Sequence, residues 1–260
     1  MNYLNYRFFD YKHNIPNFDS DLFKTEHIIF IILAFISIIS ICIFIKKVNK
    51  RKVDKYIKIM SIVITILEIT KIVWESYYDI RTGRGFNKEG ILPLYTCSLY
   101  IYCMLLAGWT KGKAKEYSLS FLTTIGLLFG GIGLVYCNGL NWYPFWTFGA
   151  FYSLFFHYIM LFTGVFLLST KYKKLEWVDA NKSFIVICCL ALISIPANYE
   201  YGADYMQLYS ASGVLVMSNI STQLANKGYR FIFTTIMLLL YIPLSFLVIG
   251  GYKLLRKIKK

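Results

Sequence analysis

Residues 27–45, HIIFIILAFISIISICIFI, form an apolar stretch that contains no Asp, Glu, Lys or Arg. A helix needs about 20 mainly apolar residues to cross the hydrocarbon core of a bilayer. In lipid a spanning segment must also satisfy its own backbone hydrogen bonds, which a helix does. The stretch therefore predicts a transmembrane helix and a membrane protein of the all-α class.

Composition supports this prediction for the whole chain. Hydrophobic residues make up 57% and charged residues 16% of the 260 residues, and the mean hydropathy is +0.52. These values are typical of a chain solvated mostly by lipid. The abundance of Ile, Lys, Asn, Tyr and Phe is typical of an AT-rich genome, which predicts the cell membrane of a low-GC bacterium.

Six further segments along the chain have the apolar character of a span. The sixth of the seven is the shortest, and its outer end, residues 196–200, is polar. We predict a single transmembrane domain over residues 1–260, built as a polytopic bundle of seven helices near residues 27–45, 57–76, 91–109, 117–137, 147–169, 183–199 and 231–252.

The basic residues predict the orientation, because Lys and Arg in short loops stay on the cytoplasmic side. With seven spans, four basic segments fall on one side, so the N-terminus is expected outside and the C-terminus in the cytoplasm. The loop with Arg81, Arg84 and Lys88 is the exception. The basic segments are residues 46–58, 111–115, 171–182 and 253–260.

The same basic edges explain most of the net charge of +14. They would face an anionic inner leaflet, so no nucleic-acid partner is expected. Residues 1–26 are polar and aromatic and lack the features of a signal peptide, which predicts an extracytoplasmic segment lying across the bundle.

Two side chains with reactive potential lie within these spans. Cys97 follows Pro93 in the third span, and His157 lies in the fifth. With a helical rise of 1.5 Å per residue, the two lie about 9 Å and about 15 Å below the outer ends of their spans. Asn198 lies at the outer end of the sixth span. The residues allow two interpretations, a thiol and base for acyl transfer or separate packing roles.

The cysteines do not indicate a metal site or a disulfide framework. They fall within or at the ends of apolar segments without metal-ligand spacing, so no metal or other cofactor is expected. The six positions are 42, 97, 103, 137, 188 and 189.

The second span carries Glu68, Lys71 and Glu75, whose spacing places them on one face of a helix. Ionisable groups in a membrane normally face the bundle interior or a water-filled cavity. Two interpretations stay open: the three residues pair with one another and lock helices together, or they orient a substrate and tune His157.

Three motifs resemble, in order and interval, the YwaF-type bacterial integral membrane proteins. They are residues 92–99 (LPLYTCSL), residues 151–158 (FYSLFFHY), and Asn198 followed by residues 204–208 (DYMQL). That family is similar to a eukaryotic transmembrane lipid acyltransferase of ether-phospholipid metabolism. The chain differs from the bacterial pattern at three positions. Where this chain has Tyr95 or Thr96, the pattern often has His or Gln, and where it has Asp204, the pattern often has Asn.

The resemblance implies a phospholipid acyltransferase or transacylase in which Cys97 carries the acyl group as a thioester. His157 matches the histidine of the fifth-span motif and is implied as the base that takes the thiol proton. Asn198 or the hydroxyls of Thr96 and Ser98 would donate to the developing oxyanion, and Tyr205 belongs to the supporting motif. The partners implied are membrane lipids, a phospholipid donor and a lysolipid acceptor.

A transporter or receptor is the alternative from a different functional class. In that case Glu68, Lys71 and His157 would line a pocket for a small solute or ion. No inverted repeat is evident in the sequence. Four glycines in the fourth span would permit close helix packing or a kink, and packing is the more common role; they are Gly126, Gly130, Gly131 and Gly133.

Overall fold

The computed structural model describes residues 7–12, 18–45, 48–83, 88–211 and 215–258. Arg84, two segments of the predicted N-terminal region, residues 46–47 of the first basic loop and residues 259–260 of the basic tail lie outside the described residues. Within the described residues the chain is helical and contains no strand, which confirms the all-α class.

Two compact units make up the chain. Unit 1 comprises residues 1–87 and 126–172, and unit 2 comprises residues 88–125 and 173–260. The helices of unit 1 are α1 (Thr25–Phe44), α2 (Lys50–Arg81), α6 (Ile125–Val135), η3 (Asn138–Asn141) and α7 (Phe148–Ser169). Those of unit 2 are α3 (Lys88–Ile91), α4 (Leu99–Trp109), α5 (Gly112–Thr123), α8 (Val178–Tyr201), η4 (Tyr205–Gln207), α9 (Leu215–Asn226) and α10 (Arg230–Ile258).

Five segments in the described residues are long and apolar enough to cross a membrane. They are residues 25–44, 112–141, 148–169, 178–201 and 230–257, which agree with five of the seven expected spans. The second expected span lies in α2, which has sufficient length at 32 residues but is too polar to belong to the five.

The third expected span, residues 91–109, is not one continuous helix. Residues 92–98 are not helical, and α4 begins only at Leu99. Pro93 explains the interruption, because proline lacks a backbone N–H and disfavours helical geometry at the preceding residue. The depth of about 9 Å expected for Cys97 assumed a helical rise and therefore does not apply.

The fourth expected span is interrupted at Thr124, between α5 and α6. Thr124 has φ −116° and ψ −90°, and its hydroxyl donates to the carbonyl oxygen of Ser120 at 2.7 Å. Such bonds from a Thr side chain to the preceding turn often bend helices. The polar segment between the sixth and seventh spans also contains a helix, α9, that the sequence did not predict.

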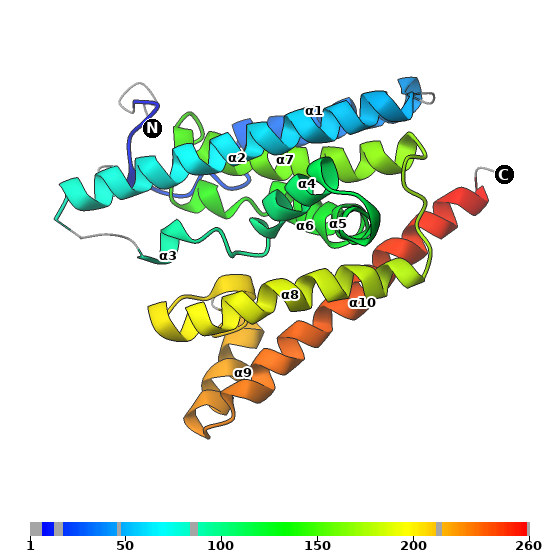
Figure 1. Cartoon of the computed structure of the whole chain (residues 1–260). Helices are drawn as coiled ribbons and strands as arrows, with labels where there is room; N and C mark the ends of the chain where they lie inside the picture. The colour runs from blue at the N-terminus through cyan, green and yellow to red at the C-terminus, as the bar shows by residue number, and fades with distance from the viewer. Residues whose placement is uncertain (1–6, 13–17, 46–47, 84–87, 212–214, 259–260) are drawn as a thin grey trace. The chain divides into compact units, whose positions relative to one another are not determined.

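Helix α7 organises unit 1, where it runs alongside α1 and α2 (Figure 1). Ser37 of α1 and Tyr158 of α7 share a hydroxyl hydrogen bond of 2.9 Å, and Tyr56 of α2 and Thr163 of α7 share one of 2.7 Å. The backbone of α7 also lies so close to α6 that a Cβ on Gly130 would stand 2.5 Å from the Leu161 nitrogen. Close packing is therefore the role of this glycine.

Unit 2 is held together by a buried carboxylate at the start of α8. Asp179 accepts hydrogen bonds from the Ser120 hydroxyl at 2.7 Å, the Lys173 ammonium at 2.7 Å and the Glu176 N–H at 2.8 Å. Buried charges persist in proteins when they are paired and hydrogen-bonded in this way. Asp179 thus joins α5 and the connection before α8 to the helix itself.

Candidate functional site

Cys97 lies in a turn that leads into α4. Cys97 is partly exposed, whereas Cys103 within α4 is fully buried. The Cys97 carbonyl accepts the Tyr100 N–H at 3.0 Å, and Ser98 is the buried N-terminal capping residue of α4.

A chain of hydroxyl groups fixes the residue before Cys97. The Tyr241 hydroxyl donates to the Met206 carbonyl oxygen at 3.2 Å and lies 3.0 Å from the Thr96 hydroxyl. Because Tyr241 has one hydroxyl hydrogen, Thr96 is the donor in the second bond. The Thr96 hydrogen is therefore engaged with Tyr241.

Asn198 holds the loop between α8 and α9 through both ends of its amide. Its Nδ2 donates to the Tyr205 carbonyl oxygen at 3.0 Å, and its Oδ1 accepts the Tyr205 N–H at 2.6 Å. Both residues are buried, and the Tyr205 ring packs against Tyr95 at 5.2 Å between centroids. The Asn198 amide thus stabilises the loop that packs on the Cys97 turn.

Asp204 explains the departure of this chain from the resembled motif. One carboxylate oxygen accepts the N–H groups of Tyr209 and Ser210 at 3.1 and 2.9 Å, and the other accepts the Ser210 hydroxyl at 2.9 Å. An Asn side chain has a single acceptor oxygen. The carboxylate therefore suits three donors in a loop where Met206 and Gln207 both have positive φ angles, 55° and 56°.

In unit 1, His157 is fixed by its own helix. Its Nδ1 lies 2.7 Å from the Ser153 carbonyl oxygen. A carbonyl oxygen only accepts, so Nδ1 carries the hydrogen, and in the neutral ring Nε2 has the basic lone pair. A Cβ on Gly133 would stand 2.3 Å from Nε2 and 2.0 Å from Cδ2, so α6 must have a glycine opposite this ring.

His27 shows the contrasting arrangement. Its Nδ1 accepts the Phe23 N–H at 3.1 Å, and its Nε2 lies 3.1 Å from the Leu134 carbonyl oxygen. Both ring nitrogens of this fully buried residue are engaged with backbone groups. His27 therefore serves to join the start of α1 to α6.

The charged residues of α2 form a compact network. Lys71 lies 3.6 Å from a carboxylate oxygen of Glu68 and 3.6 Å from one of Glu75. The Tyr152 hydroxyl donates a hydrogen bond to Glu68, and the Lys71 ammonium lies 5.6 Å from the centroid of the Tyr152 ring. The network therefore links α2 to α7 through one tyrosine.

Comparison with known proteins gives a family. A sequence model of the TMEM164 family matches residues 22–248. The chain belongs to the TMEM164 family. No curated protein and no solved structure matches it.

The match extends over both units of this TMEM164 family member and includes every predicted site residue. The structure brings Thr96, Ser98 and Cys97 together with Asn198 and Tyr205 in unit 2. It brings the three charged residues of α2 together in unit 1, which also contains His157.

Sequence reasoning missed two tyrosines of these sites in the TMEM164 family member. Tyr241 is the hydroxyl partner of Thr96, and Tyr152 is the hydroxyl partner of Glu68. Each tyrosine has a hydroxyl group within an expected span, where a polar group needs a hydrogen-bond partner. That requirement is the signal that would have indicated them, since Tyr152 already lies in the motif with His157.

Proposed function

We propose that this TMEM164 family protein is a membrane-embedded phospholipid acyltransferase that uses Cys97 as nucleophile and His157 as base. The observation that carries the proposal is the partly exposed Cys97 in a turn whose preceding residue, Thr96, is hydrogen-bonded to Tyr241. Covalent catalysis depends on such a positioned nucleophile. The residue pattern of the resembled acyltransferase supports the same assignment.

The first half-reaction transfers an acyl group to the enzyme. His157 Nε2 takes the proton from the Cys97 thiol, and the sulfur attacks the ester carbonyl carbon of a phospholipid. The ester C–O bond breaks, the lysolipid oxygen takes the proton from the imidazolium, and a thioester remains on Cys97. The Ser153 contact supports the role of Nε2, because it keeps the hydrogen of the neutral ring on Nδ1.

The second half-reaction regenerates the enzyme. The hydroxyl of an acceptor lysolipid gives its proton to Nε2 and attacks the thioester carbon; the C–S bond breaks, and the sulfur regains the proton. Ser98 and the second N–H of Asn198 are the proposed oxyanion donors. Thr96 is proposed to orient the turn, because its hydrogen is engaged with Tyr241.

The experiment is acyl labelling of the purified full-length protein in bilayers containing phospholipid with a radioactive acyl chain. We expect a hydroxylamine-sensitive adduct that is lost in Cys97→Ser and kept in Cys103→Ser, whose side chain is fully buried. Absence of label on Cys97 in a folded protein overturns the proposal.

A second experiment tests the base. His157→Gln should slow alkylation of Cys97 by a small, membrane-permeant maleimide, since the thiolate is the nucleophile. The control is His27→Gln, which removes the imidazole of the histidine in α1. Equal alkylation rates in wild type and His157→Gln would exclude His157 as the base for Cys97.

The membrane arrangement belongs to the same proposal. We propose seven crossings with the N-terminus outside and the C-terminus in the cytoplasm of a low-GC bacterium. In this arrangement α2 is a crossing helix despite its charges, which pair with one another. Labelling of single cysteines by an impermeant reagent in intact cells should modify a cysteine placed at Asp19 and spare one placed at Lys257.

The charged network favours a second candidate, a small-solute or ion transporter or receptor. Glu68 and Lys71 are buried or partly buried in α2, as expected for residues that line a polar path. In that case solute uptake would survive Cys97→Ser and fail in Glu68→Gln. The acyltransferase predicts the opposite dependence on Cys97.

A further inference from the structure

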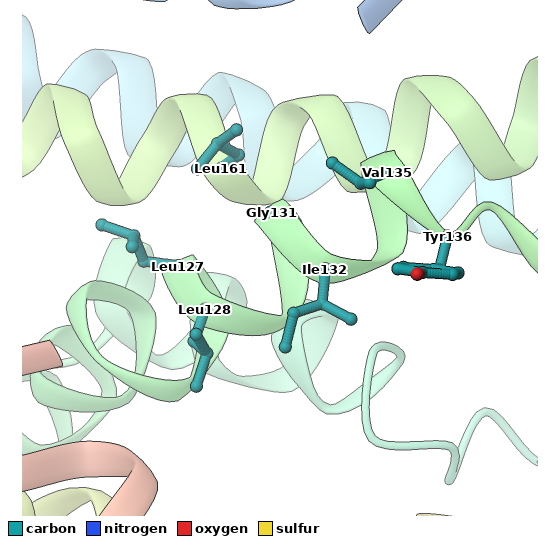
Figure 2. A pocket seen from close by; sticks show the side chains of 7 residues that line it. All are labelled: Leu127, Leu128, Gly131, Ile132, Val135, Tyr136 and Leu161. Carbon is teal, nitrogen blue, oxygen red and sulfur yellow. The ribbon is translucent and has the colours of Figure 1, made fainter. Parts of the chain in front are cut away.

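Two hollows lie on unit 1, and they differ in chemistry. The first, of about 370 Å³, is lined by uncharged residues of α6, by Tyr136 directly after that helix and by Leu161 of α7 (Figure 2). The second has a volume of about 470 Å³ and lies between the N-terminal segment, α1, the connection before α7, and α7 itself. We call the second the α1–α7 groove. Only this groove has a charged side chain, Glu26, among its described lining residues.

The α1–α7 groove is polar at one end and apolar along its length. On α1 it is lined by Glu26, Ile29 and Leu33, which lie on one face of the helix. Leu33 follows Glu26 by seven positions, which is about 10 Å along the helix axis. On α7 it is lined by Phe151 and Phe155, whose rings stack at 5.3 Å.

Helices α1 and α7 both begin at the polar end of the groove. Glu26 lies in the first turn of α1, and Trp146 lies two residues before α7 begins. Tryptophan is enriched at the level of lipid headgroups, where its ring contacts both apolar chains and polar groups. Trp146 is 63% exposed and Leu33 59% exposed, so the groove is open along its apolar wall.

Glu26 makes no hydrogen bond or ion pair with any residue in the described parts of the chain. Its place in the first turn of α1 favours a negative charge through the helix dipole, which explains why the side chain is tolerated there. The carboxylate keeps its capacity to accept hydrogen bonds from a ligand. A primary ammonium group is the complementary partner, because it has a positive charge and three donors.

We propose that the α1–α7 groove binds one molecule of phosphatidylethanolamine. Its ammonium group donates to the Glu26 carboxylate, and one acyl chain lies along Ile29 and Leu33 against the Phe151 and Phe155 rings. A quaternary ammonium cannot donate a hydrogen bond, and an anionic headgroup is repelled by Glu26, so the groove discriminates among lipid headgroups. Neither Cys97 nor His157 lines the α1–α7 groove. The proposed lipid binding therefore does not depend on the proposed acyltransferase activity.

Native mass spectrometry of the full-length protein tests the proposal directly. The probes are phosphatidylethanolamine, phosphatidylcholine and phosphatidylglycerol with identical acyl chains. We expect phosphatidylethanolamine to bind most tightly, and Glu26→Gln to weaken its binding about tenfold, the effect of losing one charge-assisted hydrogen bond. The Cys97→Ser protein should bind this lipid as the wild type does, which separates this test from that of acyl transfer.

A second variant examines the apolar wall without altering Glu26. Leu33→Trp fills the groove and should abolish retention of phosphatidylethanolamine. Ile39→Trp is the control, because Ile39 is similarly exposed on α1 at 56% and does not line the groove. Equal binding of all three lipids, unchanged binding in Glu26→Gln, or equal effects of the two tryptophan variants would each overturn the proposal.

Discussion

The contact between Gly133 and His157 allows a quantitative test of how the candidate base is held. In Gly133→Ala the new Cβ would stand 2.0 Å from Cδ2 of His157, whereas fewer than one in ten real Cβ contacts is shorter than 3.4 Å. The imidazole ring must therefore move by more than an ångström. Such a movement also breaks the 2.7 Å contact between Nδ1 and the Ser153 oxygen.

Two effects determine the magnitude for Gly133→Ala. Overpacking of a filled site costs about 1–3 kcal/mol, and replacing a helical glycine by alanine returns about 0.5–1 kcal/mol. We expect a net loss of about 1–2 kcal/mol in the free energy of unfolding, from the balance of these two terms. On the proposed mechanism labelling of Cys97 should also slow, because a displacement of about 1 Å in a catalytic group can cost about 100-fold in rate.

Gly131→Ala is the matched control on the same helix. Its Cβ would stand 3.7 Å from the nearest atom of Leu161, an ordinary contact, so we expect unchanged or slightly higher stability. The assay is denaturant unfolding of the purified protein in mild detergent, together with acyl labelling. If His157 is the obstacle, adding His157→Ala to Gly133→Ala restores the stability. The reasoning is refuted if the two single alanine variants unfold alike.

Two further predictions concern the Cys97 turn. Asn198→Ala removes both hydrogen bonds to the Tyr205 backbone and leaves buried groups unsatisfied, so it should lower the free energy of unfolding by about 2–4 kcal/mol; a loss below about 0.5 kcal/mol in thermal unfolding would contradict this role. Tyr241→Phe removes the hydroxyl that bonds Thr96 and the Met206 carbonyl oxygen but keeps the ring, so it should lower the free energy of unfolding by about 1–3 kcal/mol and change the rate of Cys97 alkylation. An unchanged alkylation rate would show that the hydroxyl chain does not position the thiol.

The expected spans show what local pattern can predict. The apolar stretch at residues 27–45 became α1, Thr25–Phe44, because hydropathy and length act within one segment. The same reasoning failed at residues 91–109, where Pro93 prevents a continuous helix. In α8 the helix instead continues through Pro196 to Tyr201 and ends before Gly202, which has a φ of 66°. The two prolines thus have different effects, so the position of a proline alone does not predict where a helix ends.

The residues of the candidate site likewise include some that the sequence predicted and some that it did not. The face shared by Glu68, Lys71 and Glu75 followed from helical spacing, and the structure shows their ion pairs. The partners Tyr152 and Tyr241 did not follow, because each is far from its contact along the chain. Thr96 and Tyr241 are separated by 145 residues.

The sequence by itself determined that this is an all-α membrane protein, where the long apolar helices lie, and that a thiol and an imidazole occur within expected spans. These conclusions depend on hydropathy and periodicity, which are local properties. Only the tertiary structure decided that Tyr152 pairs with Glu68, that Gly133 must lack a side chain opposite His157, and that Glu26 borders an apolar groove. Each of these depends on atoms that packing brings together from different helices or turns, and spacing along the chain does not encode such distances.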